Sequence, residues 1–102
     1  MKKRLLIIPA KGYSKRIKNK NIKIFLGKPI IEYPIKLAKS SNLFSKIHIS
    51  TDSHKIKNIT EKLNCKIDFM RPNFLASKNV PIIDVMRYVT KKYENLGYEF
   101  DE

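Results

Sequence analysis

The stretch IIPAKGYSKRIKNKNI, residues 7–22, contains the features that decide the fold. Its first residues complete a short apolar run, residues 5–8, that ends at Pro9. Such a run is typical of a strand buried on both faces of a parallel sheet. Residues 11–28, which follow, carry two glycines and many lysines but no sustained helical period, so they predict a loop.

Helix and strand patterns alternate after this loop. Apolar residues at helical spacing predict three helices, and side-chain alternation predicts two further strands, at 46–50 and 66–70. This β-α-β-α-β-α order predicts an α/β fold, a parallel sheet with right-handed crossovers and helices on its faces. Residues 98–102 are expected to lead into a further strand.

Each expected helix has one apolar face. These faces consist of Ile31, Ile35 and Ala38, then Ile56, Ile59 and Leu63, and last Ile82, Met86, Val89 and Tyr93. Either Asp52 or Ser53 is suited to cap the second helix. Pro34 and Pro81 fall in the first turns of their helices, where a missing N–H is best tolerated.

The basic loop has the chemistry of a polyphosphate site. Its cations within thirteen residues are Lys11, Lys15, Arg16, Lys18, Lys20 and Lys23. Gly12 and Ser14 lie between them, and a glycine lets backbone N–H groups turn toward an anion. The lysines would then neutralise a triphosphate and the charge that develops on a leaving pyrophosphate. A basic surface loop without a ligand explains the same residues equally well, and the spacing is not that of a Walker motif.

Three sequence features follow predicted strands directly. They are the basic loop, the residues STD at 50–52 and the residues MRP at 70–72. Ligands of parallel sheets bind at the carboxyl ends of the strands. The three features therefore predict a ligand site at one edge of the sheet.

The composition limits the other classes of protein. The 102 residues suffice for one small domain, and 22 Lys and Arg against 9 Asp and Glu give a net charge of +13. The cations are spread along the chain, which favours surface solvation over nucleic-acid binding. The single cysteine, Cys65, excludes an internal disulfide and is expected to be a buried thiol. No apolar segment has the length of a membrane span or of a signal peptide, so a cytoplasmic protein is expected.

The string IPAKGYSKRIKNKNIKIFLGKPIIEYPI, residues 8–35, resembles the opening of acylneuraminate cytidylyltransferases. The later family elements follow in order: NLF at 42–44, ISTD at 49–52, FMRP at 69–72 and LA at 75–76. FMRP is most similar to the pseudaminic-acid type of the family. The family has Arg where this chain has Lys11, and a glycine where it has Tyr13.

The resemblance implies a Rossmann-like nucleotidyltransferase fold and a reaction of CTP with a nonulosonic, sialic-acid-like sugar. The products are the CMP-sugar and pyrophosphate, with Mg²⁺ as cofactor. By motif position Lys20 is the catalytic residue near the α-phosphate, and Arg71 reads the cytosine. The other nucleotide-binding residues implied by the motif are Ala10, Lys11, Gly12, Ser14, Lys15 and Asn21.

Family members continue well beyond this length, and their sugar-binding segment and Mg²⁺ ligands lie in that later part. Residues 1–102 are therefore expected to be a truncated, N-terminal nucleotide-binding half with little activity alone. Its open sheet edge is expected to favour association, a homodimer included. The alternatives are a related CTP-dependent enzyme for another sugar such as an octulosonic acid, a CTP-binding module without catalysis, and a small basic nucleic-acid-binding domain. The last lacks a recognised nucleic-acid motif and an aromatic stacking strip.

Overall fold

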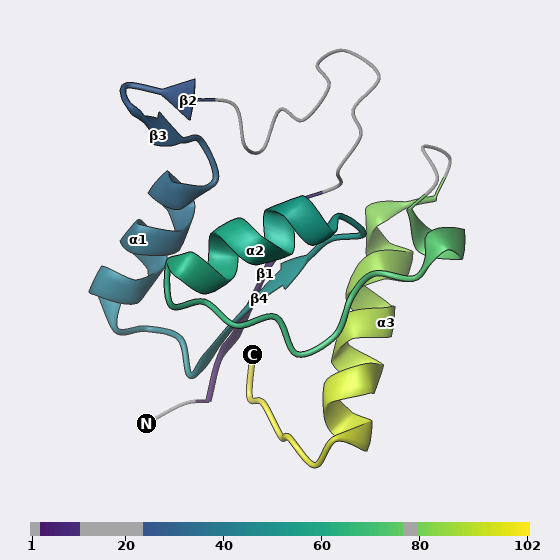
Figure 1. The fold of residues 1–102 in the computed structure, drawn as a ribbon. Coiled ribbons are helices and arrows are strands. Elements are labelled where there is room, and N and C mark those ends of the chain that lie inside the picture. The colour runs from purple at the N-terminus through teal and green to yellow at the C-terminus, as the bar shows by residue number, and fades with distance from the viewer. Residues whose placement is uncertain (1–2, 11–23, 77–79) are drawn as a thin grey trace.

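A parallel pair of strands, β1 (Leu5–Pro9) and β4 (Lys46–Ser50), lies at the centre of the fold (Figure 1). The computed structural model describes residues 3–10, 24–76 and 80–102. The remaining elements are β2 (Ile24–Phe25), β3 (Lys28–Pro29), α1 (Glu32–Ser41), α2 (His54–Lys62), the 3-10 helix η2 (Asn73–Leu75) and α3 (Ile82–Asn95). The predicted α/β class, a parallel sheet with flanking helices, is confirmed.

The two central strands pair from Leu5 opposite Lys46 to Pro9 opposite Ser50. One further bond, from the Ala10 N–H to the Ser50 carbonyl at 2.8 Å, extends the pairing past the end of β1. Successive side chains on a strand point to opposite faces, so β1 and β4 each serve two hydrophobic clusters. The carboxyl ends of both strands meet at Ala10 and Ser50.

The two clusters lie on opposite faces of the pair. The first is built from Ala10, Ile31, Ile35, Ile49, Ile56, Cys65 and Ile67, and so joins α1 and α2 to the sheet. The second is built from Leu75, Val85, Val89 and Tyr93, and Leu5 and Ile7 of β1 pack against it. The first two helices therefore cover one face and α3 covers the other.

The third predicted strand, 66–70, is wrong. Its side chains do not alternate as those of a strand would, since Ile67 and Phe69, two residues apart, pack in clusters on opposite faces of the strand pair. Over the part of the chain that the structure describes, the first backbone bond from this segment toward β4 is made by Arg71, whose N–H donates to the Thr51 carbonyl at 2.6 Å. The side chains hold the segment in place without the ladder of backbone bonds that defines a strand.

A small hairpin stands where a loop was predicted. Ile24 pairs with Pro29 and Phe25 with Lys28 in antiparallel register. Leu26 and Gly27 between them have positive φ angles of 50° and 85°. Two positive φ angles are what a tight hairpin turn of the primed type requires, and glycine meets that requirement at the second position.

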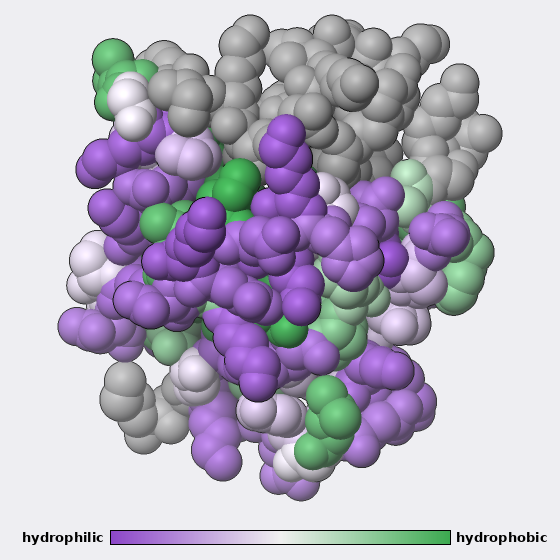
Figure 2. All heavy atoms as spheres, in the orientation of Figure 1, coloured by the Kyte–Doolittle hydropathy of each residue, from purple (hydrophilic) through white to green (hydrophobic). Residues whose placement is uncertain are grey.

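The helices begin where the caps and prolines predict. Ser53 caps α2, because its Oγ accepts a hydrogen bond from the Ile56 N–H at 3.3 Å, which decides between the two candidate caps. Ile35 and Ala38 are buried on the predicted face of α1. Figure 2 shows hydrophilic side chains over most of the face that α2 presents to the viewer, the polar side of an amphipathic helix.

The buried face predicted for α3 is only half right. Val89 and Tyr93 are buried as predicted, and Val85 joins them. Ile82 and Met86, however, remain 51% and 39% exposed. The helix is rotated so that the row Val85, Val89 and Tyr93 points at β1 and β4.

Replacing the cap of α2 should weaken the domain by a small, measurable amount. Ser53→Ala leaves the Ile56 N–H without its partner, and loss of a serine cap costs about 1 kcal/mol. We expect a lower midpoint of urea unfolding with an unchanged slope. Ser40→Ala, at an exposed serine inside α1, is the matched control and should shift the midpoint by much less. Equal effects of the two substitutions would contradict the capping role.

Candidate functional site

The site is built at the carboxyl edge of the strand pair. Ala10, directly after β1, is fully buried, and its N–H is bonded to the Ser50 carbonyl. Ser50 and Thr51 at the end of β4 are buried as well. Arg71 reaches this edge from the segment that follows α2. The edge predicted to hold a ligand thus brings together the ends of three chain segments.

Arg71 is fixed in this edge. Its side chain is only 6% exposed. The Nε–H donates to the Ser50 Oγ at 3.0 Å, and Nη2 donates to the Ser50 carbonyl at 3.1 Å. Two bonds to one residue set both the position and the plane of the guanidinium. The Arg71 side chain therefore does not face the solvent.

The charge of Arg71 is held in a largely buried setting. Burial lowers the pKa of the guanidinium, and the negative charge of Asp52 opposes that shift. An arginine nevertheless remains protonated in proteins. A fixed buried cation with a planar set of donors is suited to recognising carbonyl and ring-nitrogen acceptors of a base or the oxygens of a phosphate.

Ser50 is the residue that sequence reasoning missed. Its carbonyl accepts from both the Ala10 N–H and Arg71 Nη2, and its hydroxyl accepts from Arg71 Nε. One buried serine thereby fixes two candidate nucleotide-binding residues relative to each other. The available signal was its place in the STD string at the end of a predicted strand.

The structure describes two of the eight predicted site residues, Ala10 and Arg71, and brings both of them to Ser50. The other six predicted residues lie outside the described residues: Lys11, Gly12, Ser14, Lys15, Lys20 and Asn21. Their roles in phosphate and nucleoside binding stay predictions. Within 3–10, 24–76 and 80–102, no group of three or more His, Cys, Asp or Glu side chains could hold a metal ion.

A chain of polar groups crosses from β4 to α3 below this edge. Lys46 Nζ lies 2.7 Å from Asp68 Oδ2, and the Tyr93 hydroxyl donates to the same oxygen at 2.8 Å. His48 Nδ1 lies 2.9 Å from the Tyr93 hydroxyl. Because the single hydroxyl proton goes to Asp68, the histidine must donate, so neutral His48 carries its proton on Nδ1.

The surroundings of these polar groups explain the protonation state of each. Burial lowers the pKa of His48 to about 4, against an opposing effect of Asp68. Burial also raises the pKa of the Tyr93 phenol well above its ordinary value. For Asp68 burial acts upward, but the hydrogen bonds from Lys46 and Tyr93 outweigh it and lower the pKa of the carboxyl. At neutral pH this series of polar groups therefore consists of the Lys46 cation, the Asp68 carboxylate, the neutral Tyr93 phenol and the neutral His48 imidazole.

The two histidines, Tyr88, Tyr93 and Cys65 occupy structural positions. His48 is a strand residue that faces a helix, since its ring lies edge-on to that of Tyr93, with 5.3 Å between centroids. His54 is exposed at the start of α2. Tyr93 packs in the second cluster and Tyr88 packs against it. Cys65 is buried, and burial raises the pKa of its thiol.

These features define a class of protein. A parallel strand pair with helices on both faces and a fixed arginine at its carboxyl edge is the arrangement of a Rossmann-like, nucleotide-binding α/β domain. Residues 5–95 match the family model described as cytidylyltransferase, which is most of the chain. The chain belongs to the cytidylyltransferase family.

Characterised relatives are found in several bacteria. The chain is 45% identical over 74 residues to a pseudaminic acid cytidylyltransferase of Campylobacter jejuni, covering 72% of this chain and 32% of the relative. It is 39% identical over 90 residues to a Helicobacter pylori protein named as both pseudaminic acid cytidylyltransferase and a hydrolase of a UDP-linked trideoxy sugar, covering 88% and 17%. The N-acylneuraminate cytidylyltransferase of Escherichia coli is 33% identical over 90 residues, covering 87% and 21%. The chain spans a third or less of the length of these three relatives.

Proposed function

We propose that this chain supplies the CTP-binding part of an enzyme that couples a nonulosonic acid to CMP. The observation that carries the proposal is the fixed guanidinium of Arg71 on Ser50, near the buried Ala10 that follows β1, in a chain of the cytidylyltransferase family. The names of the relatives support the class of sugar, and pseudaminic acid is the favoured member because two of them act on it.

Arg71 is proposed to recognise the cytosine. Cytosine presents a carbonyl oxygen and a ring nitrogen that both accept hydrogen bonds, whereas uracil presents a donor in place of that nitrogen. A guanidinium can only donate. An arginine held in one plane by Ser50 therefore favours CTP over UTP.

The basic loop is proposed to hold the triphosphate. Lys11 and Lys15 would neutralise the phosphates together with the backbone around Gly12, and Asn21 would contact the nucleoside. Lys20 would lie at the α-phosphate. The anomeric hydroxyl of the sugar loses its proton to solvent as its oxygen attacks the α-phosphorus, the bond from that phosphorus to the bridging oxygen breaks, and pyrophosphate leaves with the electron pair. A cation at this position stabilises the charge that develops in that step.

The described residues contain no group of three or more His, Cys, Asp or Glu side chains suited to hold Mg²⁺. We expect the Mg²⁺ ligands to lie outside this chain.

No described helix is long and apolar enough to cross a membrane. We propose the cytoplasm as the location, where CTP is available and a lone thiol such as Cys65 stays reduced. We also propose that the protein forms a homodimer.

Calorimetric titration with CTP and UTP tests the proposed recognition. We expect CTP to bind more tightly than UTP, and Arg71→Lys to weaken CTP binding about tenfold, because a lysine cannot make the planar contact. Lys20→Ala should weaken binding of both nucleotides by a similar factor, since it removes a phosphate contact. Lys91→Ala, an exposed lysine on α3, is the control and should leave both affinities unchanged.

The same titration separates the alternatives. A mixed oligonucleotide that binds tightly and competes with CTP without base preference would support the nucleic-acid-binding domain instead. Selective CTP binding without any CMP-sugar formed from CTP, Mg²⁺ and a nonulosonic acid is the result expected for the 102-residue chain alone. Turnover by this chain would show that it carries the whole reaction.

A further inference from the structure

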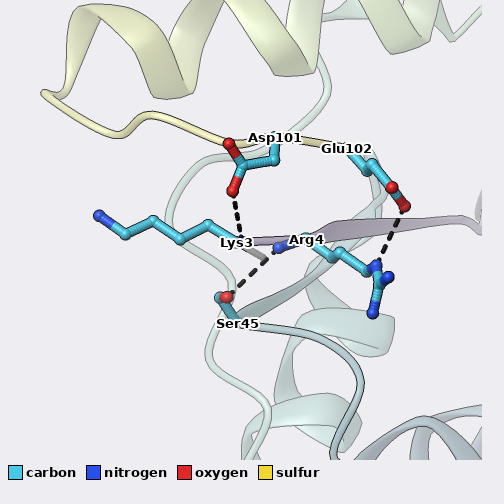
Figure 3. A network of polar contacts seen from close by, with 5 residues as sticks. All are labelled: Lys3, Arg4, Ser45, Asp101 and Glu102. Atoms are coloured by element: carbon cyan, nitrogen blue, oxygen red, sulfur yellow. Dashed lines mark hydrogen bonds and ion pairs between the residues drawn. The ribbon is translucent and has the colours of Figure 1, made fainter. Parts of the chain in front are cut away.

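The strand β4 is the fixed reference for the segment that carries Arg71. Its last three residues, 48–50, are buried, whereas residues 5–8 of β1, predicted to be buried on both faces, are only partly buried. The start of β4 is tied to β1, because the Arg4 N–H donates to the Ser45 Oγ at 3.3 Å and the Ser45 N–H donates to the Arg4 carbonyl at 2.9 Å (Figure 3). The start of β4 is therefore held by β1, and its end is held by burial.

Three side-chain contacts join β4 to residues 68–71. The strand contributes every second residue to these contacts, and alternate side chains of a strand point to the same face. The contacts follow the same order along both segments. They are Lys46 with Asp68, His48 with Phe69, and Ser50 with Arg71. We call these three pairs the side-chain ladder.

The side-chain ladder stands in for backbone bonds. Among the residues that the structure describes, no backbone bond joins residues 66–70 to β4, and the first such bond runs from the Arg71 N–H to the Thr51 carbonyl. Backbone bonds normally set the register of a segment against a neighbouring strand. Here the register before Arg71 is set by side chains, so the contacts that precede Arg71 determine where its guanidinium can reach.

Asp68 ties the segment to two elements at once. Its Oδ2 lies 2.7 Å from Lys46 Nζ of β4 and accepts from the Tyr93 hydroxyl of α3 at 2.8 Å. The Lys46 and Asp68 side chains are only 23% and 20% exposed. A partly buried ion pair is screened by water and salt much less than one on an open surface. The first contact of the side-chain ladder is therefore a strong one.

The Asp68 contact lies far from the carboxyl edge. Lys46 begins β4 and Ser50 ends it, and four steps of about 3.3 Å place the two residues roughly 13 Å apart. A carboxylate beside Lys46 does not touch a base that is bound by Arg71 at the other end of the strand. Asp68 can act on that base only through the segment that it shares with Arg71.

We propose that Asp68 is a positioning residue for Arg71. Its bonds to Lys46 and Tyr93 set the register of residues 68–71 on β4, and with it the place of the guanidinium at the carboxyl edge. This inference rests on the proposed recognition of cytosine by Arg71. Loss of the Asp68 charge would let the segment shift, so the donors of Arg71 would no longer align with the acceptors of the base. The contacts of the triphosphate do not involve this segment, so the preference for CTP over UTP should suffer most.

The variant Asp68→Asn tests the inference by calorimetry and NMR. The amide keeps an acceptor for Tyr93 but loses the charge that pairs with Lys46. We expect CTP to bind about fivefold more weakly, the upper end of what an ion pair contributes, while the affinity for UTP changes little. In the chain without nucleotide, the Arg71 Nε–H, which is bonded to the Ser50 Oγ, should exchange with water severalfold faster. Lys46→Met removes the other partner and should act in the same direction.

Glu61→Gln is the matched control. It breaks an ion pair with Lys57 within α2, at 3.3 Å, that has no part in the side-chain ladder. It should leave the nucleotide affinities and the exchange of the Arg71 Nε–H unchanged. All variants are compared at a temperature at which circular dichroism shows each of them to be folded.

The Arg71→Lys background separates this inference from the proposed function. Arg71→Lys alone decides whether Arg71 recognises cytosine, because an unchanged preference for CTP would contradict that recognition. The exchange of the Arg71 Nε–H decides independently whether Asp68 positions the arginine. In the Arg71→Lys background, Asp68→Asn should not change the ratio of CTP to UTP affinity any further. A further loss there, or unchanged exchange of the Arg71 Nε–H in both Asp68→Asn and Lys46→Met, would overturn the inference.

Discussion

Tyr93→Ala is expected to remove most of the stability of the folded chain at room temperature. The Tyr93 ring is fully buried at the centre of the second cluster and lies against His48 and Phe69, with ring centroids 5.3 and 5.0 Å away. Truncating a buried aromatic residue to alanine costs about 3–5 kcal/mol. A domain of this size has about 5–15 kcal/mol in total, and one with an incompletely covered strand is expected near the lower end. Urea titration followed by far-UV circular dichroism measures the loss.

Tyr93→Phe separates packing from hydrogen bonding. It keeps the ring but leaves the His48 Nδ1–H without an acceptor and Asp68 with one donor fewer. The expected cost is about 1–3 kcal/mol, clearly less than that of the alanine variant. Thr90→Ala, at an exposed position on the same helix, should change stability by less than about 0.5 kcal/mol. If phenylalanine and alanine at position 93 were equally destabilising, packing of the ring would not be the main contribution of Tyr93 to stability.

Stability should fall steeply as the pH drops from 6.5 to 4. Burial lowers the pKa of His48 to about 4, whereas the unfolded chain titrates near 6.5. Between these values the unfolded state binds a proton that the folded state does not, so protonation favours unfolding. The contribution is complete above pH 6.5 and is lost by pH 4. Its size is on the order of 3 kcal/mol, since one pKa unit corresponds to about 1.4 kcal/mol.

Urea midpoints measured between pH 8 and pH 4 give this dependence. His48→Gln cannot be protonated and should flatten the curve in that interval, even though it lowers stability at neutral pH. His54→Gln is the control, because His54 is exposed and its replacement should leave the curve as steep as before. A wild-type midpoint that stays constant from pH 6.5 to pH 4.5 would falsify the assignment of a buried, neutral His48.

The sequence predicted the elements that are decided locally. The apolar run before Pro9, the alternation at 46–50 and the cap at Ser53 each depend on a few neighbouring residues, and all are present in the structure. The position of Arg71 at the carboxyl edge was also predicted, although the strand expected before it does not form. Its bonds to Ser50 were not, because they depend on the packing of two segments about 20 residues apart.

The errors arise where distant segments decide the outcome. Residues 66–70 have the pattern of a strand, yet the backbone bonds that would make them one depend on how close the chain comes to β4. The exposure of Ile82 and Met86 depends on how α3 is rotated on β1 and β4, which no helical period reveals. The β2–β3 hairpin was missed because Leu-Gly is a weak turn signal compared with Asn-Gly.

The pairing of β1 with β4 has a consequence for synthesis of the protein. Arg4 and Ser45, at the start of the pair, are 41 residues apart. At about 5–20 residues per second, the ribosome needs several seconds to deliver β4 after β1 has been made. During that interval the apolar run of β1 has no partner from its own sheet, and unpaired apolar strands are prone to aggregate. The lysines and arginines on either side of the run keep the nascent segment charged while it waits.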